Sequence, residues 1–123
     1  MVQSLTKLNV IDNSGATGAK VIRVLNKKKV GRIGSLVVVT ITKNVRNSKI
    51  RKGTVHKGII VRTKVKSKEF NQSLKWFENS MVLVKEKGND YLPIGSRLKG
   101  GIASELRTKI GCNKILALAN KVF

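Results

Sequence analysis

Lysine and arginine are the residues whose number and spacing in this sequence indicate chemistry. The 123 residues include 26 lysines and arginines against 6 aspartates and glutamates, which gives a formal net charge of +20. Residues 13–68 hold 16 of these cations and no acid. A field of this sign attracts polyanions, and cationic side chains neutralise phosphates while releasing condensed counterions. Nucleic acid is therefore the expected partner.

An anionic membrane is the weaker alternative partner. The cations are interleaved with strand-like apolar residues and do not form the polar face of an amphipathic helix. No apolar run approaches the ~20 residues of a membrane-spanning helix. The first residues contain neither a signal-peptide core nor an arginine-rich transit helix. We expect no membrane partner, and a protein that works where it is synthesised.

Catalytic chemistry is not indicated by the remaining polar residues. General acid–base catalysis needs positioned titratable groups, and the chain has one histidine and six scattered acids. Asp12 lies in an Asp-Asn-Ser-Gly sequence that favours a turn over a catalytic role. A metal at His56 would need companion ligands, and Cys112 is the only cysteine, so neither a disulfide within the chain nor a cysteine cage can form. We expect a binding protein with no catalytic residue, no cofactor and no metal.

The cations of residues 51–66 must be positioned by a strand. From Val55 onward, apolar residues alternate with polar and cationic ones, the period-two pattern of a half-buried strand. The face expected to enter the core consists of Val55, Ile59, Val61 and Val65. The face expected to meet phosphates consists of His56, Arg62, Lys64 and Lys66. A solvated edge strand, protected from aggregation by lysine, is the alternative.

Further strands are predicted along the chain, which favours a mainly β fold. They are expected at residues 5–11, 19–25, 36–42, 74–77 and 81–85. In the second of these, Val21 and Leu25 share one face while Ile22 and Val24 share the other, which suggests a strand covered on both faces in a small closed barrel.

Two basic loops connect these strands, at residues 26–34 and 43–53. The glycines of the first loop would let backbone amides approach a phosphate closely, with a solvated hairpin tip as the alternative. It is not a nucleotide-binding P-loop, because no Gly-Lys-Ser or Gly-Lys-Thr follows.

The last third of the chain changes in composition. A glycine-rich loop from Pro93 precedes a short helix expected at residues 102–109, with Ile102 and Leu106 on one face. An apolar segment at residues 114–119 is expected to return to the barrel. No repeat or linker appears, so we expect one domain over residues 1–123, with a loop and helix region at about 93–123.

Several blocks occur in an order that resembles a known family. They are Leu8-Asn9-Val10-x-Asp12-Asn13-Ser14-Gly15-Ala16, Arg51-Lys52-Gly53 leading to Val61-Arg62-Thr63-Lys64, Phe77-Glu78-Asn79, Pro93-Ile94-Gly95-Ser96-Arg97 and Glu105-Leu106-Arg107. Together they resemble the universal large-subunit ribosomal protein fourteen family over essentially the whole chain.

The resemblance implies a five-stranded β-barrel with a C-terminal loop and short helices. It also implies a structural constituent of the large ribosomal subunit that binds rRNA at the subunit interface and supports an intersubunit bridge. The implied partners are ribosomal proteins three and nineteen, small-subunit rRNA across the bridge, and the ribosome silencing factor. The alternative function is a free-standing RNA or DNA chaperone built on the same basic barrel.

The basic residues and the resemblance together predict two sets of site residues. The rRNA-binding set is Lys27, Lys28, Lys29, Arg32, Lys43, Arg46, Lys49, Arg51, Lys52, Arg62, Lys64 and Lys66. The set expected at the interface, the bridge or the factor-docking surface is Ser96, Arg97, Arg107 and Lys114.

Departures from the family pattern indicate a compartment. Ser35 replaces the usual acid, the proline expected near Arg46 is missing, and Lys99-Gly100-Gly101 replaces Phe-Gly-Pro. Loss of acids and prolines with gain of lysine, asparagine and isoleucine resembles an organelle-encoded copy from an AT-rich genome. We expect a ribosome of the mitochondrial matrix, with a plastid or the bacterial cytoplasm as alternatives.

Overall fold

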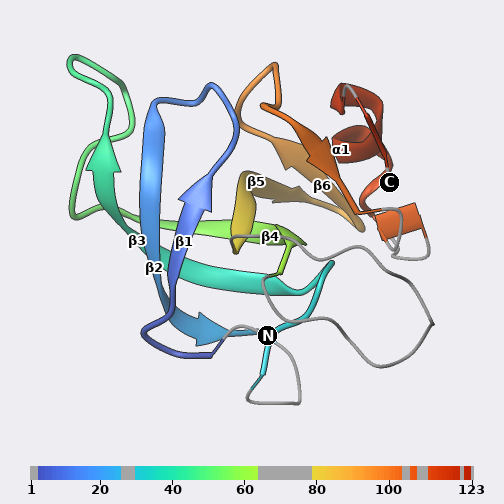
Figure 1. Cartoon of the computed structure of the whole chain (residues 1–123), viewed down its shortest axis with the longest axis horizontal. Helices are drawn as coiled ribbons and strands as arrows, with labels where there is room; N and C mark the ends of the chain where they lie inside the picture. Colours follow the sequence, from blue (N-terminus) through green and yellow to red (C-terminus); the bar gives the residue numbers. More distant parts are fainter. Residues whose placement is uncertain are drawn as a thin grey trace.

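Five strands close into a β-barrel, as the sequence predicted (Figure 1). In this computed structural model, β1 (Lys7–Val10), β2 (Ala16–Val24), β3 (Leu36–Asn44), β4 (Val55–Arg62) and β5 (Ser80–Lys87) pair in chain order, each antiparallel to the next. The barrel closes where β1 pairs in parallel with β5, Asn9 opposite Ser80 and Val10 opposite Met81. The structure describes residues 3–25, 30–63, 79–103, 106–107 and 111–119, together with the backbone of 121–122.

The two halves of β5 have different partners. Its first residues close the barrel against β1, whereas Val84 to Lys87 pair with an extra strand, β6 (Asp90–Pro93). The turn between β5 and β6 contains Gly88 at a φ of +60°, a left-handed conformation that glycine adopts without steric cost. Beyond β6, β7 (Gly101–Ile102) pairs in parallel with β8 (Lys121–Val122), and helix α1 (Asn113–Leu118) lies beside β6 (Figure 1).

The apolar residues form two separate cores. The barrel interior contains Leu8, Val10, Ala16, Ala19, Val21, Val24, Val37, Val39, Ile41, Ile60, Met81 and Leu83. The second core lies between the outer face of β4 and β5 and the C-terminal segment, and it contains Ile11, Ile33, Ile59, Val61, Val82, Val84, Leu98, Ile102, Ala103, Leu106, Cys112 and Ile115. Consecutive residues of β4 and β5 thus point alternately into the two cores.

The prediction for β4 was therefore wrong in two respects. Val55 is not a core residue, because 60% of its surface is exposed. Ile59 and Val61 are buried as predicted, but in the second core, while their neighbour Ile60 points into the barrel. The prediction from alternating residues failed because both faces of this strand are covered, and a strand buried on both faces has a continuous apolar run in place of an alternating pattern. Val65, together with Lys64 and Lys66, lies outside the described residues.

The prediction that β2 is covered on both faces was also wrong. The register with β3 shifts between Val21 and Arg23, the mark of a β-bulge. The bulge adds one residue, so Val21 and Val24 both enter the barrel, although they are three apart. Ile22 and Leu25 are left exposed on the outside.

The C-terminal elements also differ from those expected. The helix predicted at residues 102–109 is replaced, where the chain is described, by β7 and a short 3₁₀ turn at Leu106. The apolar segment at 114–119 forms α1, which returns to the outer face of the barrel through Ile115 and adds no strand to it. Ile115 on α1 and Leu106 both bury their side chains in the second core, so packing against β4 and β5 determines the local structure here. The strand predicted at 74–77 lies outside the described residues.

Candidate nucleic-acid interface

The turn between β1 and β2, residues 11–15, is organised by Asp12. Its Oδ1 accepts hydrogen bonds from the backbone N–H and the hydroxyl of Ser14, at 3.2 and 2.5 Å, and its Oδ2 accepts one from the backbone N–H of Leu83 at 3.1 Å. Only 4% of Asp12 is exposed. Burial raises the pKa of this carboxyl, while the hydrogen bonds from Ser14 and Leu83 oppose the rise. Asp12 is thus a turn-forming residue that also fixes the turn to β5.

The next residue, Asn13, attaches the turn to a distant loop. Its Oδ1 accepts hydrogen bonds from the backbone N–H groups of Ser96 and Arg97, at 2.7 and 3.1 Å, and its Nδ2 donates to Ser96 Oγ at 3.0 Å. A Cβ atom at Gly95 would come within 2.7 Å of Asn13 Oδ1, so only glycine allows this approach. Two sequence blocks 83 residues apart therefore form one structural unit.

The basic loop, residues 43–53, lies against the other side of the same turn. The backbone N–H of Val45 donates to Gly15 O at 2.7 Å, and Ser48 Oγ donates to Ile50 O at 2.5 Å. Gly15 adopts a φ of +110°, and a Cβ atom there would lie 2.5 Å from Ser48 Cβ. The loop is thus held close to the β1–β2 turn, while its cations remain exposed: Lys43, Arg46, Lys49, Arg51 and Lys52.

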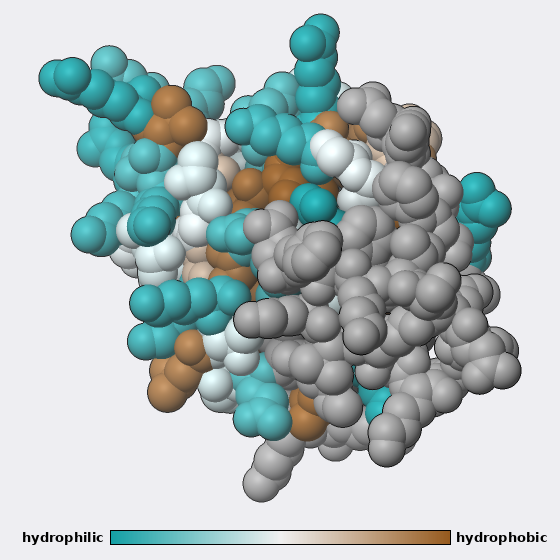
Figure 2. Space-filling model, viewed as in Figure 1, coloured by the Kyte–Doolittle hydropathy of each residue, from teal (hydrophilic) through white to brown (hydrophobic). Residues whose placement is uncertain are grey.

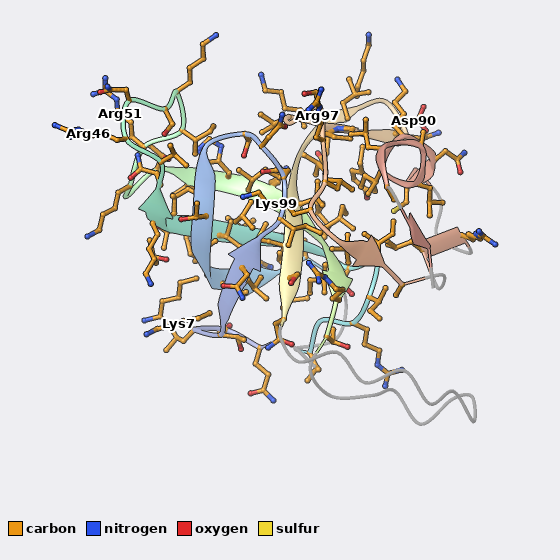
Figure 3. All side chains as sticks on the ribbon, turned by 45° about the horizontal axis from the view of Figure 1, so that its top comes forward. Lys7, Arg46, Arg51, Asp90, Arg97 and Lys99 are labelled. Carbon is orange, nitrogen blue, oxygen red and sulfur yellow. The ribbon has the colours of Figure 1, made fainter. Side chains whose placement is uncertain are left out.

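A groove separates the β1–β2 turn from the basic loop. Its volume is about 460 Å³, and its lining includes Asn13, Ser14, Val45, Arg46, Asn47, Lys49 and Lys99. Lys99 arrives from the 94–99 loop and its backbone N–H donates to Ile11 O at 2.7 Å. Arg46 and Arg51 lie on one side of the β1–β2 turn and Arg97 and Lys99 on the other (Figure 3). Three cations from two distant segments therefore surround this groove.

The charge on this surface has few local counterions. Residues 13–68 contain no acid, and Asp12, the acid next to the groove, is buried and hydrogen-bonded. The ion pair between Lys57 Nζ and Glu86 Oε2, at 3.2 Å, joins β4 to β5 and uses neither the basic loop nor the groove. Figure 2 shows hydrophilic residues spread over much of the described face, with hydrophobic residues in small separate areas. The surface suits a polyanion better than an apolar partner.

Residues 1–123 match the family described as Ribosomal protein L14p/L23e. The chain belongs to this family. Membership confirms the predicted family, and it makes the chain a large-subunit ribosomal protein and not an enzyme, as predicted, with rRNA and ribosomal proteins as its class of partner. The contacts of Asp12, Asn13 and Gly95 give a physical reason for two of the blocks by which the L14 family was recognised.

The structure of this L14 family member divides the predicted rRNA-binding residues between two ends of the barrel. The cations of the basic loop lie at the end of β3 or beyond it, whereas Arg32, which is exposed, precedes it. The nine residues of β3 span roughly 26 Å, so these two groups cannot contact the same phosphate. Arg62 ends β4, at the opposite end from Arg51. The continuous row of cations expected along residues 51–66 is thus not seen in the described part of that stretch.

Arg62 differs from the other described cations of the predicted set. It is half-buried, and its Nη1 lies 3.6 Å from the position that a Cβ atom would take on Gly100. The sequence placed this side chain on the face opposite the predicted core; in the structure the segment that carries Gly100 lies against it, and its contact with rRNA stays a prediction. Five members of the set lie outside the described residues: Lys27, Lys28, Lys29, Lys64 and Lys66.

The four residues predicted for the interface are all exposed. Ser96 and Arg97 are positioned by Asn13, as described above. Lys114 lies on α1, and Arg107 lies in the 3₁₀ turn that precedes it. Sequence reasoning missed Asn13, Asn47 and Lys99 as candidates. Lys99 could have been noted as a cation in the 93–101 loop, but its proximity to Arg46 depends on contacts between segments about 50 residues apart.

Two other kinds of site were searched for among the described residues. No group of three or more histidines, cysteines, aspartates or glutamates there could hold a metal ion. No helix in the same part of the chain is long and apolar enough to span a membrane.

Proposed function

We propose that this protein binds large-subunit rRNA at the subunit interface and supports an intersubunit bridge. The observation that carries the proposal is the basic loop, whose five exposed cations are held beside the barrel with no acid in residues 13–68. Lysine and arginine that contact phosphates position a protein on RNA without reading its sequence. Because hydrogen bonds already hold this loop in place, its cations can contact phosphates with little loss of conformational entropy on binding.

The proposed rRNA contacts fall into two groups. The first group is the basic loop, with Lys43, Arg46, Lys49, Arg51 and Lys52. The second group is at the other end of β3 and β4, with Arg32 and Arg62. We also propose rRNA contacts for five residues outside the described part of the chain: Lys27, Lys28, Lys29, Lys64 and Lys66. Because the groups are separated by the length of a strand, they would contact different segments of the rRNA backbone. Such contacts would fix the orientation of the barrel on the subunit.

The 94–99 loop and the C-terminal segment form the proposed protein-contact and bridge surface. Ser96, Arg97, Arg107 and Lys114 are exposed there, and they would serve ribosomal proteins three and nineteen, small-subunit rRNA, or the ribosome silencing factor. We further propose that the ribosome is mitochondrial, on the basis of the lysine-, asparagine- and isoleucine-rich departures from the family pattern.

Sedimentation tests the ribosomal assignment. The tagged protein is expressed in the cells of origin, and matrix and cytoplasmic extracts are run separately on gradients at rising salt. We expect the protein to remain with large subunits of the matrix ribosome, because many contacts in an assembly resist the salt that weakens an isolated phosphate-binding protein. Recovery at the top of every gradient would contradict the proposal and favour a free-standing RNA-binding protein.

A charge reversal tests the surface itself. Arg51→Glu with Lys52→Glu should lower incorporation into large subunits, whereas the unfolding temperature of the isolated protein should stay within a few degrees, since both side chains are exposed. Lys85→Glu with Lys87→Glu reverses the same charge on β5 and serves as the matched control. Equal incorporation of the two variants would show that the basic loop is not the rRNA-binding surface.

A further inference from the structure

The groove between the β1–β2 turn and the basic loop has the size of a small-ligand site. Its volume of about 460 Å³ lies within the range of roughly 300–1,000 Å³ that is usual for such sites. It is far too small to enclose an RNA duplex. A ligand that enters it must therefore be a single small unit.

The charges around the groove select an anion. Arg46 and Lys49 come from the basic loop and Lys99 from the opposite wall, and all three are exposed. The one acid of the lining, Asp12, already accepts hydrogen bonds from Ser14 and Leu83 and is almost completely buried. An anion in the groove would thus be attracted by three cations and repelled by only one carboxylate, which is already hydrogen-bonded.

The remaining lining is suited to a flat, partly apolar group with polar edges. Val45 is 53% exposed and offers an apolar surface beside the cations. Ser14, Thr17 and Asn47 add side chains that can donate and accept hydrogen bonds. A phosphate alone would leave this part of the groove unused.

Both walls of the groove are already held in place. The backbone hydrogen bond from Val45 to Gly15, at 2.7 Å, fixes the basic loop, and the one from Lys99 to Ile11, also at 2.7 Å, fixes the opposite wall. Asn47, which lines the groove, adopts a φ of +61°, a conformation uncommon for a residue other than glycine. A site formed before binding costs little ordering entropy.

We propose that this groove binds one unpaired nucleotide of RNA, with its phosphate among Arg46, Lys49 and Lys99 and its base against Val45. The inference rests on the proposed rRNA-binding function and specifies which RNA feature the surface recognises. Unstacked bases in loops and bulges are the parts of RNA that a protein can enclose and hydrogen-bond. The protein would thus recognise a bulged or looped nucleotide in addition to the phosphate backbone.

The first experiment uses the full-length protein and four small probes: AMP, UMP, ribose 5-phosphate and inorganic phosphate. Backbone amide signals are followed by NMR at low salt during titration. We expect at least one of the nucleotides to shift the signals of Ser14, Gly15, Asn47 and Lys99 and to bind about tenfold more tightly than ribose 5-phosphate, because its base would bury apolar surface against Val45 and form hydrogen bonds with the polar lining. Equal binding of the nucleotides and ribose 5-phosphate, or no shift at these residues, overturns the inference.

Matched variants test the residues of the groove. Arg46→Gln with Lys49→Gln should weaken nucleotide binding roughly tenfold or more, because charge-assisted hydrogen bonds are lost. Arg51→Gln with Lys52→Gln removes the same charge from the same loop but outside the groove, and should weaken binding less than about threefold through the general field alone. Lys99→Gln should also weaken binding, whereas Lys85→Gln should not. Equal losses in the groove and control variants would contradict a defined site.

An RNA titration separates this inference from the proposed function. A short duplex is compared with the same duplex carrying a single-nucleotide bulge. We expect the unaltered protein to prefer the bulged RNA and Arg46→Gln with Lys49→Gln to lose that preference. A protein that enters large subunits but shows no preference for the bulge refutes only the groove, whereas absence from large subunits refutes the proposed function.

Discussion

The two sides of this barrel are built on different patterns. On the β2–β3 side, alternate residues of β3 such as Val37, Val39 and Ile41 fill the interior, while the residues between them are partly exposed. On the β4–β5 side, consecutive residues are buried, because the C-terminal segment covers the outer face. The basic loop joins the two sides, since it leads from β3 into β4, and the chain continues from β5 through β6 to the C-terminal loop and helix (Figure 1).

This difference separates stability from binding. Where a strand is covered on both faces, as at residues 58–61 of β4 and 80–84 of β5, it contributes apolar burial on each face and carries no exposed cation. The exposed cations of these strands, such as Lys57 and Lys85, lie outside the covered part. A strand covered on one face leaves its ends and outer surface free for charge. The β1–β2 turn lies at the boundary, since Asp12 bonds to β5 while Asn13 bonds to the 94–99 loop.

The largest effect should come from truncating the second core. Ile59→Ala removes a completely buried side chain of β4 and should lower the free energy of unfolding by about 2–5 kcal/mol. Ile22→Ala on the uncovered side is the control and should change it by less than about 1 kcal/mol, because this side chain is 47% exposed. Chemical denaturation measures both. Similar losses would mean that the two sides do not differ as described.

A smaller effect is expected at the boundary. Asn13→Ala removes the side-chain hydrogen bonds to Ser96 and Arg97 and should cost about 1–2 kcal/mol of unfolding free energy. Asn13→Asp keeps the oxygen that accepts from both backbone N–H groups, so it should cost less. Denaturant titration of the two variants gives the comparison. If the aspartate variant lost as much as the alanine variant, the acceptor bonds would not be what holds the loop.

The next expected effect is a pH dependence at Asp12. Burial raises its pKa above the ordinary value of 3.8, so the folded protein keeps a proton that the unfolded chain has already lost. The resulting stabilisation is present below the unfolded pKa and is lost as the pH rises through the folded pKa. The stability of the unaltered protein relative to Asp12→Asn should therefore decrease as the pH rises from about 3.8. A relative stability that increases with pH would show that the hydrogen bonds outweigh burial.

The smallest effect is expected for the ion pair on the outer surface. Lys57 and Glu86 are 44% and 43% exposed, so Glu86→Gln should change the unfolding free energy by less than about 1 kcal/mol. The change in unfolding free energy caused by Glu86→Gln should become smaller still at high salt, because salt screens exposed charges. A loss comparable to that of Ile59→Ala would mean that the pair is screened from water on the covered side.

Parts of this fold could be predicted from local pattern alone. Leu8 and Val10 are two apart in the strand predicted at residues 5–11, a spacing that puts them on one face, and both enter the barrel. The segment at 36–42 forms most of β3, and the turn at Asp12 occurs where the Asp-Asn-Ser-Gly sequence predicted it. These features depend on residues within a few positions of one another, which is why the sequence reveals them.

Other parts depend on contacts between distant segments. The bulge in β2 follows from its pairing with β3, and the burial of both faces of β4 follows from the C-terminal segment. In the C-terminal segment, a strand forms at Ile102 where a helix was predicted, and a helix forms at residues 113–118. The local structure there is the one that lets Ile102 and Ile115 bury their side chains against β4 and β5. Local propensity is overridden where tertiary burial is larger.

The sequence by itself determined the charge of this protein, its mainly β character, its lack of a catalytic constellation and its family. These properties follow from the composition or from short sequence patterns, and they do not depend on which distant segments come into contact in the fold. Only the tertiary structure decided which cations lie around one groove. Arg46 and Lys49 meet Lys99 because Asn13 and Gly15 hold two distant loops against one turn, whereas Arg32 and Arg51 are separated by the length of a strand.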